Sequence, residues 1–477
     1  MDAQRGIARR MVIGLPMEGL SPAWEKDFSA YPPAGVIVFR RDFDGLEGLR
    51  RLTARLRELA RPRRIFVAID EEGGWVSQLA GHLLVPPNAL LLARGAEPGE
   101  IETTARVTGE RLRALGVDWV FAPVADVNTE PRNPVIGPRS FGNDPALVSR
   151  CVGEALAGFR AAGIGACLKH FPGHGDTAVD SHLGLPVCDA SEEDMDEIHL
   201  RPFREHAGAD AVMSSHVVHR AFDRANPSTF SHAVMTGVLR ERIDFRGVAI
   251  TDALEMQGAA LGQTPYEACR RALSAGCDLI MIAHWDDSIR RARLELAKAL
   301  VDEAFDRAVF DAARPRLAAF DRAVAEPREM ELARPLEALT PPDWNRMLER
   351  IVERGIRFRG GLPAEARGRP WHVSEPGFAR GETFAAALRA AGVPVADAAE
   401  DAFPVRVVAS RVPLPIADLE RLRFDAARQP LVLVSLQNDD VVDEVPDAVL
   451  RVSGTDCTEL TRRVVARALA ARLRATV

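Results

Sequence analysis

Short apolar runs, each bounded by polar residues, glycine or proline, recur through the N-terminal part of the chain. Between them, several segments show the spacing of three or four positions that an amphipathic helix has, as at Ile101, Ala105, Thr108, Leu112 and Leu115. The runs predict eight strands: Met11–Leu15, Gly35–Phe39, Ile65–Asp70, Trp119–Val124, Ala166–His170, Ala211–His216, Gly247–Thr251 and Asp278–Ala283. Eight strands alternating with helices predict an α/β fold of the (β/α)8 TIM-barrel type.

Reactive side chains stand at or just beyond the C-terminal ends of these predicted strands. They are Asp70, Asp126, Lys169, His170, His216 and Asp252. Charged groups on central strands are costly to bury without a partner or a role. In a (β/α)8 barrel the C-terminal strand ends form the active-site face, so we expect these side chains to meet there.

The pattern changes beyond Pro327, where an Ala-, Arg-, Glu- and Pro-rich stretch ends at Pro341 and Pro342. This stretch predicts a helical linker that closes a barrel domain over residues 1–340. Further apolar runs then alternate with helical segments and predict a small parallel α/β domain over residues 341–477. Its expected strands are Trp371–Ser374, Val405–Ala409, Leu431–Leu436 and Val449–Val452. This domain has no sharp motif, so both a packing or dimerisation role and a loop lent to the active site stay open.

Composition narrows the class of protein. Apolar residues make up 47% and charged residues 27%, and the net charge of −7 arises from interspersed charges of both signs, which disfavours a nucleic-acid partner. No apolar stretch approaches the roughly 20 residues of a membrane helix, and the N-terminus lacks a secretion-signal pattern. Six scattered cysteines predict reduced, buried thiols. We therefore expect a cytoplasmic protein without a cofactor, as a monomer or weak dimer.

Histidines gather in one part of the chain, since seven of the eleven lie between His170 and His219. The densest stretch runs from Lys169 through Thr177, and Asp180-Ser181-His182 follows it. Its proline and glycines predict a loop over the barrel mouth. There Asp180 can accept a hydrogen bond from one ring nitrogen of His182 and raise the basicity of the other, which makes a proton shuttle.

A single carboxylate ends the apolar run Val248–Thr251, namely Asp252. At the barrel mouth it is a candidate nucleophile, and the structural alternative is a cap for the following helix. A metal-binding alternative brings His170, His174 and His182 together around zinc with Asp180 or Asp252.

Several motifs, in this order, resemble glycoside hydrolase family 3, specifically its β-N-acetylhexosaminidase branch, over residues 10–330. They are Asp70-Glu71-Glu72-Gly73-Gly74, Arg139-Ser140-Phe141, Lys169-His170-Phe171-Pro172-Gly173-His174-Gly175-Asp176-Thr177, Asp180-Ser181-His182 and Thr251-Asp252-Ala253-Leu254-Glu255-Met256. The long string from Lys169 to Thr177 with its trailing Asp-Ser-His is the most specific of them.

The resemblance implies a retaining double displacement with Asp252 as nucleophile and His182, paired with Asp180, as acid and then base. It also implies sugar binding by Asp70, Arg139, Lys169 and His170. The structural alternatives are a cap for Asp70, a salt bridge for Arg139 and an internal ion pair for Lys169. His174 and Asp176 are expected to hold the shape of the loop.

The implied substrate is terminal, non-reducing β-linked N-acetylglucosamine on cell-wall fragments or chitooligosaccharides. One departure concerns Trp75 and Gln78, which stand where the family often carries arginines. A β-N-acetylglucosaminide phosphorylase, another family 3 β-glycosidase and a sugar-binding protein with decayed catalysis are the alternatives.

Overall fold

The computed structural model describes residues 2–178, 184–260, 262–302, 307–324, 326–327, 329–375, 382–409, 414–436 and 440–475. The chain divides into two compact units. Unit 1 comprises Met1–Glu71, Glu102–Thr129 and Asn143–Leu339, and unit 2 comprises Glu72–Ile101, Glu130–Gly142 and Thr340–Val477. Unit 2 thus takes two segments, 72–101 and 130–142, from the part of the chain in which the sequence predicts the barrel.

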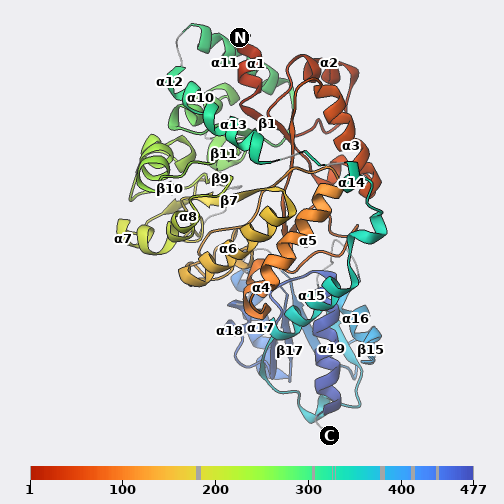
Figure 1. Ribbon diagram of the computed structural model, residues 1–477. Coiled ribbons are helices and arrows are strands. Elements are labelled where there is room, and N and C mark those ends of the chain that lie inside the picture. The colour runs from red at the N-terminus through yellow and green to blue at the C-terminus, as the bar shows by residue number, and fades with distance from the viewer. Residues whose placement is uncertain are drawn as a thin grey trace. The chain divides into compact units, whose positions relative to one another are not determined.

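Eight parallel strands of the described residues close into a barrel in unit 1 (Figure 1). Around the barrel they are β1 (Met11–Ile13), β12 (Leu279–Ile282), β11 (Val248–Ala253), β9 (Ala211–Ser214), β7 (Gly165–Phe171), β6 (Trp119–Val120), β3 (Phe66–Ile69) and β2 (Gly35–Ile37). Pairing of β2 with β1 completes the circle. Each strand overlaps one predicted apolar run, so the barrel prediction is confirmed.

The barrel holds together because its strands bury apolar side chains on both faces, as parallel strands covered by helices do. Phe66, Trp119 and Phe121 form edge-to-face ring contacts in the barrel core. Phe320, from α13 (Arg314–Ala323), packs its ring 4.8 Å from Phe66 and 4.7 Å from Trp119. Other helices of unit 1 include α3 (Gly45–Ala60), α6 (Pro145–Ala162), α10 (Pro265–Ala275) and α11 (Asp287–Val301).

Helix α10 shows how local sequence sets the element bounds. Thr264 and Glu267 form a reciprocal capping box at its start, with Pro265 at the first helical position. Gly276 ends the helix at φ +116°, a conformation that suits glycine.

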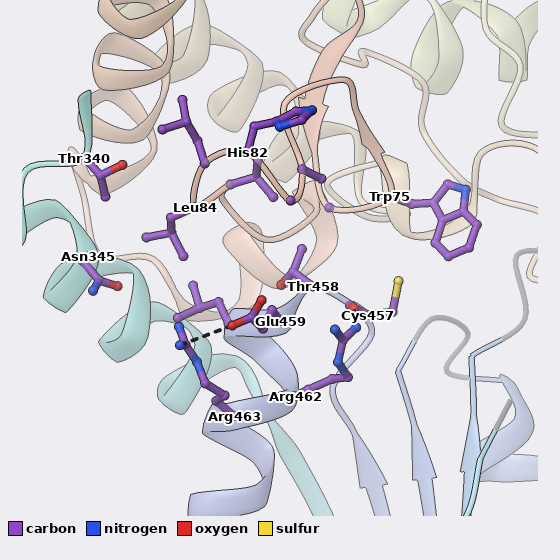
Figure 2. A pocket seen from close by; sticks show the side chains of 16 residues that line it. Trp75, His82, Leu84, Thr340, Asn345, Cys457, Thr458, Glu459, Arg462 and Arg463 are labelled. Carbon is purple, nitrogen blue, oxygen red and sulfur yellow. Dashed lines mark hydrogen bonds and ion pairs between the residues drawn. The ribbon is translucent and has the colours of Figure 1, made fainter. Parts of the chain in front are cut away.

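Unit 2 contains a six-stranded sheet in the order β13 (Arg357–Gly360), β18 (Leu450–Ser453), β17 (Val432–Ser435), β16 (Phe403–Val408), β14 (Trp371–Ser374) and β15 (Val395–Ala396). Its helices include α4 (Ala89–Gly95), α15 (Pro342–Gly355), α16 (Phe384–Ala390), α17 (Ile416–Arg428) and α19 (Glu459–Ala475). The residues at the start of α19 help to line a cavity of this unit (Figure 2).

The four predicted strands of this sheet are present, but the prediction of a parallel sheet is wrong at one edge. Strand β13 pairs antiparallel with β18, with Arg357 opposite Ser453. Its Arg-Phe-Arg-Gly sequence is largely exposed, so no apolar run marks it. Strand β15 has two residues and gives too short a signal.

All six cysteines are buried and free, as predicted. Within the described part of the chain, no helix combines the length and the apolar character needed to cross a bilayer.

Candidate active site

Asp252 lies at the C-terminal end of β11. Val248, Ala249 and Ile250 are fully buried, and the hydroxyl of Thr251 accepts a 2.9 Å hydrogen bond from the Met281 N–H, which ties β11 to β12. The Asp252 carboxylate is partly exposed, and its Oδ1 accepts the N–H of Ala253 at 2.7 Å. The next helix, α9 (Gln257–Ala260), begins five residues later, so Asp252 does not cap it.

The surroundings of Asp252 favour its ionised form. Burial alone would raise its pKa, but electrostatic interactions with His170, His216 and Lys169 and the hydrogen bond from the Ala253 N–H together lower the pKa below its ordinary value. Asp252 is therefore a carboxylate at neutral pH. A partly exposed carboxylate at a barrel mouth can attack an electrophilic carbon or stabilise a developing positive charge.

His216 fixes the backbone beside Asp252. Its ring is buried, and Nε2 donates to the carbonyl of Ala253 at 3.0 Å. Its Nδ1 lies 2.9 Å from the hydroxyl of Thr229. His216 therefore joins the segment after β9 to the end of β11 and adds to the potential that lowers the pKa of Asp252.

Lys169 and Asp70 form an ion pair between β7 and the residue that follows β3. The Lys169 Nζ lies 2.7 Å from Asp70 Oδ1, and Lys169 is only 2% exposed. The internal pairing considered for Lys169 is thus present. The pairing with Asp70 stabilises the buried charge of Lys169 and fixes its position. Asp70 is partly exposed and retains acceptor positions for hydroxyl groups.

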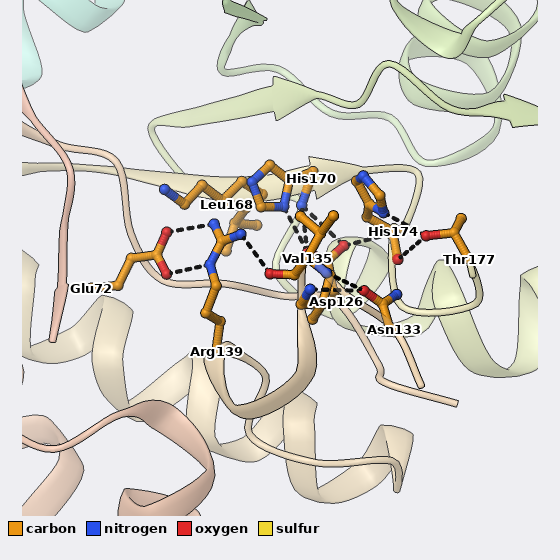
Figure 3. Close-up of polar contacts among 12 residues, drawn as sticks. Glu72, Asp126, Asn133, Val135, Arg139, Leu168, His170, His174 and Thr177 are labelled. Atoms are coloured by element: carbon orange, nitrogen blue, oxygen red, sulfur yellow. Dashed lines mark hydrogen bonds and ion pairs between the residues drawn. The ribbon is translucent and has the colours of Figure 1, made fainter. Parts of the chain in front are cut away.

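Asp126 organises the end of β7 (Figure 3). This fully buried carboxylate accepts the N–H of His170 at 3.1 and 3.2 Å, the N–H of His174 at 2.7 Å, and Nδ1–H of His170 at 2.7 Å. Burial would raise its pKa, but the charges and hydrogen bonds of His170 and His174 lower it. Because a carboxylate only accepts, the proton of the His170 ring that faces it is on Nδ1.

The loop that follows β7 is held at several further points. His174 Nδ1 lies 2.9 Å from the Thr177 hydroxyl, and Asp176 accepts the Thr129 hydroxyl at 2.8 Å. Burial lowers the pKa of His219 to about 4, and its Nε2 donates to the Gly173 carbonyl at 2.7 Å. His174 and Asp176 thus make hydrogen bonds that shape the loop.

The predicted acid/base pair, Asp180 and His182, lies outside the described residues, as do Val179, Ser181 and Leu183. The pairing therefore stays a prediction. Asp180 and His182 are also members of the zinc-binding alternative. In the remainder of the chain that the structure describes, no group of three His, Cys, Asp or Glu side chains is arranged to hold a metal.

Arg139 belongs to unit 2 and forms a two-pronged ion pair with Glu72 (Figure 3). Nε and Nη2 of Arg139 lie 2.9 and 2.8 Å from the two Glu72 oxygens, and Nη1 donates to the Val135 carbonyl at 3.0 Å. The salt bridge considered for Arg139 is present. Its sugar contact stays a prediction.

Asp126, His216 and Glu72 are functional candidates to which the sequence assigns no specific role, although Asp126 and His216 are expected on the active-site face. Asp126 and His216 carry a usable signal, because both stand at the ends of predicted strands. Glu72 lies inside the motif that begins at Asp70, but only the structure identifies Arg139 as its partner.

Known proteins resemble this chain in sequence and fold. The model of the glycosyl hydrolase family 3 N-terminal domain matches residues 21–318. A Beta-hexosaminidase of Chromobacterium violaceum is 36% identical over 323 residues, covering 65% of this chain and 90% of that protein. One from Neisseria gonorrhoeae is 37% identical over 268 residues, covering 54% and 73%. A family 3 β-N-acetylglucosaminidase structure from Paenibacillus has a TM-score of 0.87 at 27% identity, covering 98% and 96% of the two chains. The chain belongs to glycosyl hydrolase family 3.

Proposed function

We propose that this protein is a retaining β-N-acetylglucosaminidase that removes terminal, non-reducing β-linked N-acetylglucosamine from cell-wall fragments or chitooligosaccharides. The observation that carries the proposal is the partly exposed Asp252 carboxylate at the end of β11, whose pKa is held low. The names of the relatives, β-hexosaminidase and β-N-acetylglucosaminidase, support the sugar specificity. The proposal includes the cytoplasmic location and the monomeric or weakly dimeric state.

In the first step, a carboxylate oxygen of Asp252 attacks the anomeric carbon as the bond to the leaving oxygen breaks. His182 donates a proton to that oxygen, so the aglycone leaves as a neutral alcohol. The product is a glycosyl ester on Asp252. The low pKa of Asp252 favours this step, because only the ionised carboxylate is a nucleophile.

In the second step, His182 accepts a proton from water, and the water oxygen attacks the anomeric carbon. The ester bond to Asp252 breaks and the carboxylate is restored. Two inversions at one carbon retain its configuration. Asp180 holds the His182 ring in the tautomer that both steps need.

Three of the proposed sugar ligands, Asp70, Lys169 and His170, belong to unit 1 together with Asp252. Asp70 accepts hydrogen bonds from hydroxyls while Lys169 holds it in place. Asp126 fixes the His170 ring, so His170 presents its Nε2 edge in a set orientation. Arg139 is the fourth proposed sugar ligand.

Release of nitrophenol from 4-nitrophenyl N-acetyl-β-glucosaminide tests the proposal. Wild type should release it, and Asp252→Asn should lower kcat by about 10³-fold or more, because the amide is not a nucleophile. Asp287→Asn is the matched control, since this carboxylate on α11 is 85% exposed. An inactive wild type, or an Asp252→Asn variant as active as the control, would contradict the proposal.

A further inference from the structure

Unit 2 contains a cavity of about 520 Å³, a size typical of small-molecule sites. Three segments of unit 2 line it (Figure 2). They are the loop 80–85 with Gly74 and Trp75, the residues Thr340 and Asn345 at the start of α15, and residues 457–460, 462 and 463 around the start of α19. None of the residues proposed for hydrolysis lines this cavity.

The charged lining of the cavity favours an anion. Arg462 and Arg463 contribute two guanidinium groups, and Glu459 contributes one carboxylate, 3.4 Å from Arg463. The 17-residue helix α19 begins here, so its N-terminal backbone adds partial positive charge. The nearby Asp456 is not part of the lining, and its carboxylate accepts hydrogen bonds from Thr458, Thr461 and Asn88.

Arg462 supplies a second, independent indication. Its side chain is 2% exposed and donates to the Cys457 carbonyl. Burial is the largest influence on this group and lowers its pKa. A bound anion beside this buried guanidinium would favour its charged form.

The remaining residues of the cavity wall favour a ligand that has an apolar part and a hydrogen-bond donor. Leu83, Leu84 and Leu460 give the cavity an apolar wall. The side-chain oxygen of Asn345 is buried and accepts no hydrogen bond from the described residues. It can therefore accept a bond from a ligand N–H.

We propose that this cavity binds a small N-acylated organic carboxylate, the chemistry shared by N-acyl amino acids and amide-bearing sugar acids. The carboxylate lies against Arg462, Arg463 and the start of α19. The amide N–H donates to Asn345, and the apolar part packs on Leu83 and Leu84.

Isothermal titration calorimetry of the full chain tests the site with a matched pair of probes. N-acetyl-L-phenylalanine carries the carboxylate, and N-acetyl-L-phenylalaninamide is its neutral counterpart. N-acetyl-L-phenylalanine should bind saturably at one site. The affinity of N-acetyl-L-phenylalaninamide should be lower by about ten-fold or more. Inorganic phosphate should compete with N-acetyl-L-phenylalanine, because it occupies the position of the carboxylate.

Variants locate the binding. Arg463→Gln should weaken N-acetyl-L-phenylalanine at least about five-fold, and Leu84→Trp should block it by filling the cavity. Arg467→Gln is the matched control, because Arg467 lies one turn further along α19, is 48% exposed and pairs with Glu349. This control should bind like wild type.

Three results would overturn the inference. They are no saturable heat up to about 50 mM carboxylate, equal affinity for the acid and the amide, or wild-type affinity in both Arg463→Gln and Leu84→Trp. The catalytic proposal is tested separately, since Asp252→Asn should still bind the probe. Arg463→Gln should still release nitrophenol.

Discussion

Replacing Asp126 by asparagine removes one buried charge at the point where the β7 end and its loop are joined. In the wild type this carboxylate accepts two backbone N–H groups, of His170 and His174, and the Nδ1–H of His170. An asparagine side chain has one acceptor oxygen, so its NH₂ group must take the place of one carboxylate oxygen and face a donor that the carboxylate accepted a hydrogen bond from. His170 can adapt by moving its ring proton to Nε2 and accepting at Nδ1.

The expected cost follows from these contacts. Hydrogen bonds to a charged group contribute about 1.5–3 kcal/mol each, and the variant keeps one strong bond, to the His174 N–H, while it weakens the two from His170. We therefore expect Asp126→Asn to lower the free energy of unfolding by about 2–4 kcal/mol. His170 is one of the proposed sugar ligands, so the altered position of its ring proton should lower kcat/KM about ten-fold or more.

Urea unfolding at pH 7, followed by circular dichroism, measures the first effect, and nitrophenol release measures the second. Asp176→Asn is the comparison variant, because Asp176 accepts the Thr129 hydroxyl and the weak Cys188 thiol donor. It should cost about 1 kcal/mol. The reasoning is refuted if Asp126→Asn unfolds within about 0.5 kcal/mol of wild type or no more easily than Asp176→Asn.

Three further predictions concern the same site. The pKa of Asp252 is lowered from 3.8, so the fall of kcat/KM caused by protonation of Asp252 should occur below pH 3.8. His216→Gln removes an interaction that lowers this pKa, so in a pH–rate profile of the variant the fall should begin at a higher pH. Lys169→Met should raise KM about ten-fold or more because Asp70 loses the cation that holds it, and a KM equal to wild type would exclude this role. Chromatography of the products with and without phosphate should show free N-acetylglucosamine in both cases, whereas a sugar phosphate would identify the phosphorylase alternative.

The barrel is readable from sequence because its strands are covered by helices and buried on both faces, so each one appears as a continuous apolar run. The same geometry makes the strand-end residues predictable as a group, since the ends of parallel strands meet on one face. Strand β13 lacks this signal because Arg357 and Arg359 are exposed at a sheet edge.

The partners of the site residues are less readable. The bonds of Asp126 to His170 and His174 span 44 and 48 positions of the chain, and nothing near Asp126 in the sequence specifies them. The Asp70–Lys169 pair spans 99 positions. Such contacts depend on how the strands are ordered around the barrel, whereas a motif records only neighbours along the chain.

The discontinuous composition of unit 2 has a consequence for biosynthesis. Helix α4, with Leu91 and Leu92 buried, packs against α15, which leaves the ribosome some 250 residues later at about 5–20 residues per second. The close fit of Gly95 against the Ile351 carbonyl cannot form before then. A nascent chain halted near residue 340 would therefore expose the apolar side chains of α4, which α15 does not yet cover. A chaperone that binds this helix until α15 is synthesised would protect the chain from aggregation.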